Sequence, residues 1–317
     1  MKWRKLGKIF DPRDHKLSNN CFEYAQSPQT LVFDDFIRIY FSTREKDQTG
    51  KYLSHISFVD YDKGFQKILN VSTDSVIPLG KLGCFDEHGI FPLNILRDKD
   101  RVLGYISGWS RRVSVSVDTS IGLAISNDDG LTFERIGDGP ILSASLSEPF
   151  LVGDPFVRVY EGVYHMWYIY GIRWFRNSYT DEPDRVYKIG HAISPDGISW
   201  NREGRQLIGD KLNLDECQAL PTVIDFDNRY HMFFCYRQAV GFRKNKNSAY
   251  RIGYAFSSDL INWTRDDDKC GINISAGEWD SDMMCYPHVF YWNDNVYMLY
   301  NGNEFGRFGF GLAVLES

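Results

Sequence analysis

A proline inside a short apolar run recurs five times along the chain, at intervals of 64, 63, 66 and 66 residues. These prolines are Pro28, Pro92, Pro155, Pro221 and Pro287. Each run is followed by an aromatic-rich segment and then by a third strand-like segment, as in VGDPFVRVY, YHMWYIYG and IGHAIS. One such unit cannot bury its apolar face alone, so the units must pack against one another. The repeat therefore constrains the fold more than any other feature.

A fourth strand in each unit is marked by an aromatic residue, at Phe65, Phe133, Trp200 and Trp263. The fifth copy is missing at the C-terminus, where the chain stops at FGLAVLES, but the N-terminal WRKLGKIF matches WNREGRQLI. These observations predict an all-β fold, a five-bladed β-propeller with four antiparallel strands per blade. The N-terminal strand closes the last blade, because ring closure removes the unpaired edges of an open sheet.

The repeat boundaries predict a single domain over residues 1–317. The blades are expected near residues 22–80, 86–142, 149–209, 215–272, and 281–317 together with 1–10. Asp129-Gly130 and Asp196-Gly197 suit tight hairpin turns. The string from Ser126 to Phe133 matches the Asp-box turn of sialidases, and we interpret it as a structural hairpin between third and fourth strands.

Composition excludes several classes of protein. The chain has 36 Lys+Arg against 42 Asp+Glu, a net charge of −6, and no basic cluster, so no nucleic-acid partner is expected. No apolar stretch reaches the length of a membrane span. The charged start lacks the apolar region of a secretory signal, and the six cysteines are widely spaced without a CxxC pair. We therefore expect a cytoplasmic protein with reduced thiols and without a cofactor or metal; the oligomeric state is left open.

Acidic residues gather where the repeated prolines begin their strands. Five residues before the prolines stand Glu23, Glu87, Phe150, Glu216 and Asp282. Asp86 and His88 flank Glu87, and Asp154 directly precedes Pro155. In a propeller these strand starts converge on the central funnel. Clustered carboxylates shift one another's pKa values, and glycoside hydrolysis uses a protonated acid with an ionised base or nucleophile. The alternative is that single acids cap turns or pair with Arg44 and Arg237.

The loops expected on this face are polar and aromatic, which suits sugars with their apolar faces and hydroxyl edges. The predicted catalytic residues are Glu216, Asp154, Asp86 and Glu87. The predicted substrate-binding residues are Glu23, Arg44, His88, Trp109, Trp174, Arg237, Asp282, Asn301 and Asn303. The expected partner is a carbohydrate substrate.

The segments VGDPFVRVYEGVYHMWYI and DECQALPTVIDFDNRYHMFFCYR resemble the five-bladed propeller superfamily of glycoside hydrolase families 43, 32, 62, 68 and 130. The resemblance covers the whole chain and implies that Glu216 is the general acid and that Asp154 orients the substrate. In family 130 a single Asp acts through a substrate hydroxyl, which gives Asp154 a larger role. Where family 43 places its base, this chain has Ser27, so Asp86 or Glu87 is expected to serve. The pattern also resembles uncharacterised propellers associated with bacterial surface-polysaccharide biosynthesis.

Three functions stay open at this stage. The first is a glycosidase-like hydrolase or transferase, for which carboxyl oxygens of Glu216 and of Asp86 or Glu87 are expected roughly 5–10 Å apart. The second is a phosphorylase or glycosyltransferase, with phosphate held by arginines chosen from Arg44, Arg111, Arg112, Arg237 and Arg243. The third is a non-catalytic carbohydrate-binding propeller. Related propellers hold calcium in the axial channel, and His88 and His288 lie near carboxylates in the sequence, but no metal is assigned.

Overall fold

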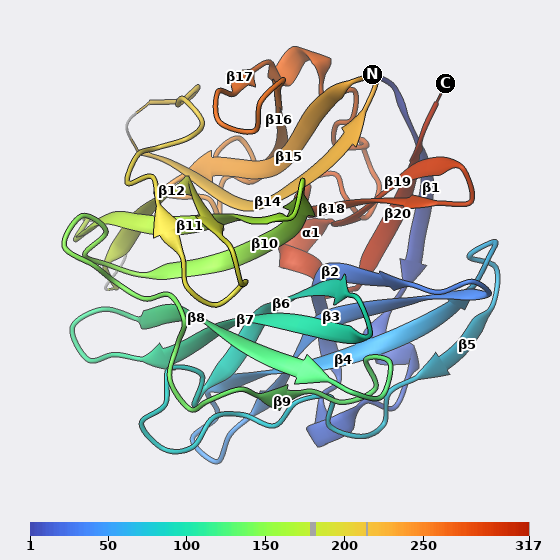
Figure 1. The fold of residues 1–317 in the computed structure, drawn as a ribbon, viewed down its shortest axis with the longest axis horizontal. Coiled ribbons are helices and arrows are strands. Elements are labelled where there is room, and N and C mark those ends of the chain that lie inside the picture. The colour runs from blue at the N-terminus through green and yellow to red at the C-terminus, as the bar shows by residue number, and fades with distance from the viewer. Residues whose placement is uncertain (178–181, 214, 317) are drawn as a thin grey trace.

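The computed structural model describes residues 1–177, 182–213 and 215–316, and the regular secondary structure of these residues is almost entirely β-strand (Figure 1). The strands form antiparallel groups of four that follow the sequence repeat. The first group contains β2 (Glu23–Val32), β3 (Phe36–Lys46), β4 (Tyr52–Asp62) and β5 (Ile68–Val71). The second contains β6 (Gly89–Asp98), β7 (Arg101–Arg111), β8 (Val117–Ser126) and β9 (Glu134–Arg135). A single parallel bridge, Ser54 to Gly89, joins these two groups into one sheet.

The remaining strands form three separate four-stranded sheets. The third group contains β10 (Val152–Tyr160), β11 (Val163–Phe175), β12 (Asp184–Ser194) and β13 (Asn201–Arg202). The fourth contains β14 (Glu216–Phe226), β15 (Arg229–Gln238), β16 (Arg251–Ser257) and β17 (Thr264–Arg265). The last contains β18 (Cys285–Trp292), β19 (Asn295–Asn301), β20 (Phe310–Leu315) and β1 (Trp3–Phe10). Short helical turns are η1 (Pro12–Asp14), η2 (Ser18–Asn20), η3 (Asp267–Lys269) and α1 (Asn303–Gly306).

The N-terminal strand completes the last sheet, as the sequence predicts. β1 pairs antiparallel with β20, with Trp3 opposite Leu315. The two ends of the chain lie on the same side of the molecule in Figure 1. The indole N–H of Trp3 also donates to the carbonyl of Cys270, which ties this strand to the neighbouring sheet.

The proline-bearing strands β2, β6, β10, β14 and β18 contact one another in cyclic order, so they surround the centre of the molecule. Polar side chains link neighbours in this ring. Asn94 donates to Gln29 at 2.9 Å and accepts from the backbone N–H of Val157 at 2.9 Å. The hydroxyl of Thr222 accepts from the N–H of Val289 at 3.2 Å. Because buried polar groups must be paired, these bonds favour one register between adjacent strands.

Each proline-bearing strand has a bulge at its proline, where the pairing with the next strand shifts register. The residue before the proline has a positive φ in four of the strands: Ser27 (54°), Asp154 (50°), Leu220 (47°) and Tyr286 (58°). Left-handed backbone is unfavourable for these residue types and is retained where surrounding structure enforces it. The bulge interrupts the regular alternation of side chains at the same position of each repeat.

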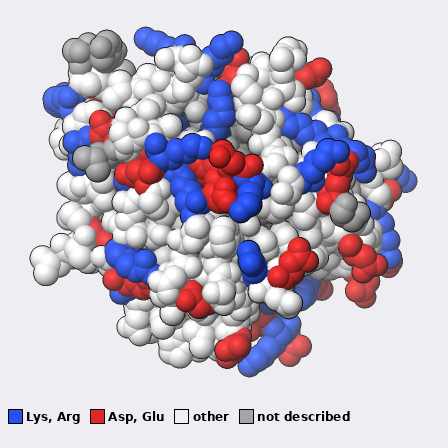
Figure 2. Space-filling model, turned by 90° about the horizontal axis from the view of Figure 1, so that it is seen from above, with Lys and Arg blue, Asp and Glu red and all other residues white. Residues whose placement is uncertain are grey.

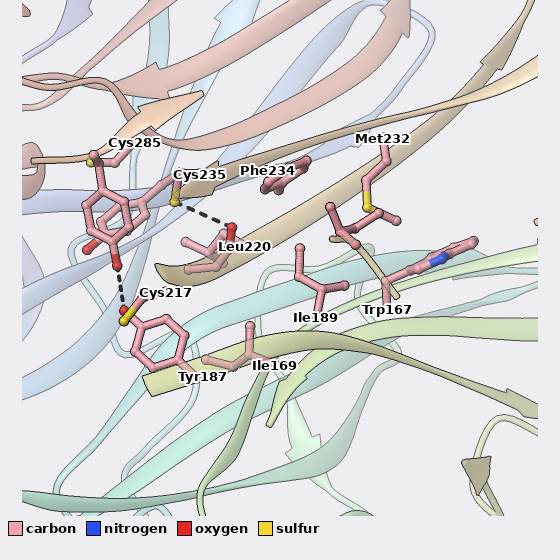
Figure 3. Packing of buried hydrophobic residues seen from close by; sticks show 14 of the residues in the cluster. Trp167, Ile169, Tyr187, Ile189, Cys217, Leu220, Met232, Phe234, Cys235 and Cys285 are labelled. Carbon is pink, nitrogen blue, oxygen red and sulfur yellow. Dashed lines mark hydrogen bonds between the residues drawn. The ribbon is translucent and has the colours of Figure 1, made fainter. Parts of the chain in front are cut away.

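Apolar side chains fill the spaces between adjacent sheets. Figure 3 shows part of the core between the third and fourth groups, in which Trp167 and Ile189 lie across from Leu220 and Phe234. All four side chains are buried. The six cysteines are free thiols, as expected from their spacing.

The Asp-box string forms a structural hairpin, which confirms that interpretation. Ser126 Oγ donates to Asp128 Oδ1 at 2.7 Å in the turn between β8 and β9. The equivalent turns of the next two groups repeat the bond, from Ser194 to Asp196 at 2.9 Å and from Ser257 to Asp259 at 3.0 Å. These carboxylates also accept backbone N–H groups of their own turns, so they stabilise the connection rather than serve a ligand.

Candidate functional site

A buried ion pair recurs in four of the five strand groups among the described residues. It joins an acid just before or at the start of the proline-bearing strand to a base two residues after the aromatic of the fourth strand. The pairs are Asp86–Arg135, Glu148–Arg202, Glu216–Arg265 and Asp280–Lys5, called here the repeat ion pairs. Each acid is at most 2% exposed. The first group has Cys21 seven residues before its proline, the place that Asp280 takes before Pro287.

Glu216 has no free oxygen in this arrangement. Its Oε1 accepts from Arg265 Nη1 at 2.5 Å and from Gln218 Nε2 at 3.0 Å. Its Oε2 accepts from the backbone N–H groups of Lys211 and Leu212, both at 2.9 Å. The residue is 0% exposed. All four bonds come from protein donors, whereas a general acid must reach the substrate. This placement argues against the predicted role of Glu216.

Asp86 is also buried in a repeat ion pair, although its Oδ1 has no hydrogen-bond partner among the described residues. Its Oδ2 accepts two hydrogen bonds from Arg135, and the residue is 0% exposed. Asp86 and Glu216 therefore occupy equivalent places in two repeats, each bound to the last strand of its own group. Both acids are enclosed by protein. Their surroundings therefore do not support the expected pairing of the two across one substrate.

The other predicted acids lie in different settings. Glu87 accepts from the backbone N–H of Gly83 at 2.5 Å and lies 3.5 Å from His88 Nε2. Glu23 accepts from Arg307 Nη2 at 2.9 Å. Asp282 is exposed at the surface. His88 in turn stacks against Trp109 with ring centroids 5.9 Å apart, so these predicted substrate-binding residues pack on one another.

The two predicted amides stabilise loops. Asn301 is 0% exposed; its Oδ1 accepts from Ser27 N–H, and its Nδ2 donates to the carbonyls of Ala25 and Gly309, all at 2.8 Å. It thereby connects β19 to β2. Asn303 accepts from the backbone N–H of Asp282 at 2.8 Å. Asn301 is thus fully occupied by protein partners.

Asp154 differs from the other predicted acids because it is buried and no described cation forms an ion pair with it. It is 7% exposed and lies at the start of β10, on the bulge before Pro155. Burial raises the pKa of its carboxyl to about 7, and the backbone N–H of Leu220 and the charge of Arg185 oppose this rise without cancelling it. A carboxyl with a pKa near neutrality is suited to donate and accept a proton at physiological pH.

Asp154 lies near Arg185 and Tyr286, which belong to a connected group of tyrosines and arginines. The hydroxyls of Tyr187 and Tyr250 lie 2.7 Å apart, and Arg237 Nη2 donates to Tyr187 at 2.8 Å. Tyr250 contacts Tyr286, the residue before Pro287, with ring centroids 5.7 Å apart. Figure 3 shows Tyr187 close to Cys217. We call Asp154, Arg185, Tyr187, Arg237, Arg243, Tyr250 and Tyr286 the central cluster.

The arginines of the central cluster have no carboxylate within ion-pair distance among the described residues. Arg237 is buried and stacks 3.5 Å above the Phe242 ring centroid. Arg243 is exposed and lies 4.3 Å from the same centroid. Partial loss of water contact beside its aromatic neighbours lowers the pKa of the Arg243 guanidinium, and the nearby charges of Arg237 and Arg185 lower it further. Mutual repulsion of this kind favours binding of an anion between the guanidinium groups.

Two further predicted residues lie beside this cluster. Arg44 stacks over Tyr24 at 4.7 Å, donates to Gln26 at 3.0 Å and has no described carboxylate partner. The guanidinium carbon of Arg185 lies 5.3 Å from the ring centroid of Trp174. By contrast, Arg111 pairs with Asp47 at 2.7 Å and Arg112 pairs with Asp118, so these two are already neutralised. Of the arginines proposed for phosphate, Arg44, Arg237 and Arg243 remain available.

The sequence reasoning missed Arg185, Tyr187, Tyr250 and Tyr286. Tyr286 carried a usable signal, because it takes the same pre-proline position as Asp154. The other three lie near the ends of β12 and β16, where the repeat does not distinguish them from packing residues.

The surface in Figure 2 carries basic and acidic side chains side by side, with one group of acids enclosed by bases rather than a continuous basic field. Within the described ranges, no group of three or more His, Cys, Asp or Glu residues is placed to hold a metal ion. No helix among the described residues has the length and apolar character needed to cross a bilayer.

Comparison with known proteins identifies relatives of the same length. "Uncharacterized protein MT1551" and "Uncharacterized protein Rv1502", from two strains of Mycobacterium tuberculosis, are each 36% identical over 318 residues, covering 100% of both chains. The chain belongs to their family. No protein-family model matches it.

Solved structures with the same fold are glycoside-processing enzymes. A structure described as "Glycoside hydrolase" superimposes with a TM-score of 0.73 at 19% identity, covering 99% of this chain and 93% of that one. A thermostable family-43 glycoside hydrolase gives 0.65 at 12% identity, covering 94% and 90%. A member of the GH130 family of mannoside phosphorylases gives 0.71 at 12% identity, covering 99% and 93%. These structures confirm, at the level of fold, the resemblance to the propeller glycoside hydrolase superfamily.

Proposed function

We propose that the five strand groups are the blades of one propeller domain over residues 1–317, with the central cluster at its axis. The cyclic contacts of β2, β6, β10, β14 and β18 support this arrangement, as does the pairing of β1 with β20. The repeat ion pairs then join the first and last strands of four blades. In this arrangement Asp154 lies at the start of a strand that faces the axis.

We infer that the protein is a glycoside-processing enzyme in which Asp154 is the proton donor. The observation that carries this inference is the environment of Asp154: it is buried, has no ion-pair partner among the described residues, and has a pKa of about 7. A group of this kind holds a proton at neutral pH and can transfer it to the leaving oxygen of a glycosidic bond. The fold shared with glycoside hydrolases and mannoside phosphorylases supports a sugar substrate.

Hydrolysis by two carboxylates needs a second acid that can reach the substrate. Glu216 and Asp86 are enclosed in the repeat ion pairs, so neither is suited to activate water. The central cluster instead offers arginines that form no ion pair with a carboxylate in the described part of the chain. This favours phosphate as the acceptor, with Arg185, Arg237 and Arg243 holding the anion.

The reaction then follows from these roles. Asp154 gives its proton to the leaving glycosidic oxygen, directly or through a substrate hydroxyl, while that oxygen separates from the anomeric carbon. A phosphate oxygen forms the new bond to the same carbon. The products are a glycosyl phosphate and a sugar with a free hydroxyl, and the arginines stabilise the phosphate throughout the transfer.

A panel of disaccharides incubated with and without inorganic phosphate tests this function, with release of sugar phosphate and of free sugar measured separately. Phosphate-dependent formation of a sugar phosphate supports the proposal. Release of free sugar independent of phosphate supports a hydrolase instead. Sugar binding without turnover of any substrate supports the third possibility, a non-catalytic carbohydrate-binding propeller.

We also propose a cytoplasmic location and a part in the assembly of bacterial surface polysaccharides. The proposed location continues the expectation drawn from the sequence, whereas the proposed part in polysaccharide assembly rests on the sequence resemblance; the bacterial origin of the two relatives is compatible with that part.

A further inference from the structure

A cavity lies at the end of the proline-bearing strands opposite to Asp154. Asp154 is near the start of β10 (Val152–Tyr160), whereas Arg158 and Tyr160 at its other end line a cavity of about 390 Å³. The ends of β2, β6, β14 and β18 supply the other walls. We call it the axial pocket. Its size falls within the range of small-molecule sites.

The walls of the axial pocket are mostly apolar. They include Leu31, Ile95, Val223, Val289 and Phe290. These five side chains come from four different strands and present branched or aromatic surface. Polar side chains lie among these apolar ones, and the apolar part of the lining favours a ligand with an apolar body.

Arg158 is the cation of the axial pocket that lacks a carboxylate partner among the described residues. Its Nη1 donates to the backbone carbonyls of Val157 at 2.8 Å and Ile95 at 3.4 Å. Its Nε and Nη2 make no hydrogen bond to a described residue, and its guanidinium lies 4.1 Å from the Phe156 ring centroid. Burial lowers the pKa of Arg158 to about 10. A charge held among apolar walls is costly unless a counter-ion binds it.

A second polar atom without a partner among the described residues, Nδ1 of His288, lies close by. His288 is 1% exposed, and its ring lies 6.1 Å from Phe156, the residue under Arg158. Its Nε2 accepts from the backbone N–H of Thr30, so its Nδ1 carries the proton and has no described partner. Burial and the nearby charge of Arg158 lower the pKa of His288. The positive charge of Arg158 disfavours a bound cation in the axial pocket.

The rim of the axial pocket sets the charge of the ligand. Arg97 lies 3.4 Å from Asp129 Oδ1, and Asp225 is the carboxylate among the lining residues. Tyr160 lies within hydrogen-bonding reach of Asp225. Asp225 repels a dianion more strongly than a monoanion, because the Coulomb energy grows with the charge of the ligand. The single guanidinium of Arg158 neutralises a monoanion fully but a dianion only in part. This favours a carboxylate over a phosphate.

We propose that the axial pocket binds a small organic monoanion, a carboxylate with a compact apolar body. The carboxylate accepts two parallel hydrogen bonds from Nε and Nη2 of Arg158, the geometry that guanidinium and carboxylate groups favour. The apolar body packs against the strand ends. The site is separate from the central cluster and does not depend on the reaction proposed there.

Calorimetric titration of the full chain with benzoate and hexanoate tests the proposal, with benzyl alcohol and inorganic phosphate as comparison ligands. We expect benzoate to bind, benzyl alcohol to bind at least tenfold more weakly, and Arg158→Met to reduce benzoate affinity at least tenfold. Arg97→Met is the matched control at the rim and should leave affinity within about twofold. Arg243→Met, in the central cluster, should leave benzoate binding unchanged, which separates this site from the proposed function.

Three results would overturn the proposal: no binding of either carboxylate, equal binding of benzyl alcohol, or benzoate affinity unaffected by Arg158→Met. Should that variant not fold, a crystal soaked with 4-bromobenzoate supplies the second measurement. We expect the bromine signal in the axial pocket with the carboxylate beside Arg158, and a signal elsewhere alone would contradict the assignment.

Discussion

Glu216 Oε1 accepts a hydrogen bond from Arg265 Nη1 at 2.5 Å, across the 49 residues that separate the start of β14 from β17. The bond joins the first and last strands of one antiparallel group. Asp86 with Arg135 and Glu148 with Arg202 make the same connection in the two preceding groups. A feature that recurs in this way belongs to the architecture of the repeat, whereas a catalytic acid is needed once.

Replacing Glu216 with Gln should lower the stability of the protein without changing the chemistry of any folded fraction. Removal of one partner of a buried ion pair leaves the other charge unpaired, which costs about 3–5 kcal/mol. Urea unfolding followed by tryptophan fluorescence measures the change in the free energy of unfolding. Turnover per folded molecule should stay within about twofold of the wild type.

The double variant Glu216→Gln with Arg265→Met is the control for this prediction. It removes both charges, so its stability should exceed that of Glu216→Gln alone. A different pattern, with normal stability and lost turnover in Glu216→Gln, would return Glu216 to the role of general acid.

Asp154→Asn should abolish turnover while leaving the fold intact, because the amide has nearly the same shape but cannot donate the required proton. We expect a loss of at least 100-fold, the lower range of the contribution of general acid catalysis. The wild-type rate of the step that uses this proton should fall as the pH rises through about 7, the pKa of the Asp154 carboxyl. A pH–rate profile measures this, and retention of activity in the variant would refute the role of Asp154.

The same pKa predicts how stability depends on pH. The carboxyl ionises near pH 4 in the unfolded chain and near pH 7 in the folded protein. The unfolded state therefore loses its proton first, and the contribution of Asp154 to stability, complete below pH 4, declines as the pH rises to about 7. Asp154→Asn removes this decline. The difference in unfolding free energy between variant and wild type, measured from pH 4 to 8, should move in favour of the variant; a constant difference would contradict the raised pKa.

Arg243→Met should weaken the use of phosphate with little effect on folding, because the side chain is exposed and has no carboxylate partner among the described residues. Loss of a charged hydrogen bond to an anion predicts a rise of about 10- to 100-fold in the KM for phosphate. The matched control is Arg112→Met, since Arg112 is exposed but already paired with Asp118. Equal effects of both substitutions would point to a general charge effect rather than a phosphate site.

Asn301→Ala should destabilise the protein by a few kcal/mol, because three hydrogen bonds are lost and each buried group left unpaired costs about 1–3 kcal/mol. KM for the sugar should not change in the folded protein. Thermal unfolding together with steady-state kinetics separates the two effects. Unchanged stability with a raised KM would instead support the predicted substrate-binding role of Asn301.

Sequence reasoning reached the strands, their order and the closure of the last sheet because these depend on a pattern that repeats every 63–66 residues. The match of Trp3 to Trp200 was enough to place β1 beside β20, since only a strand with the same pattern completes the missing group. The Asp-box turns were interpretable for the same reason. Local hydrogen bonds between residues two apart decide them.

The tertiary structure decided which acid lacks an ion-pair partner among the described residues. Glu216 and Asp154 both precede or begin a proline-bearing strand, and the residue type alone cannot distinguish them. Their protonation depends on burial and on charged neighbours, and the partner of Glu216 is 49 residues away in the chain. A partial signal existed in the recurring aromatic-x-basic motif of Trp200–Arg202 and Trp263–Arg265. The sequence by itself determined the repeat and its closure, because apolar periodicity is local; the assignment of each charge to a structural pair or to the central cluster required the folded chain, because electrostatic partners meet only in space.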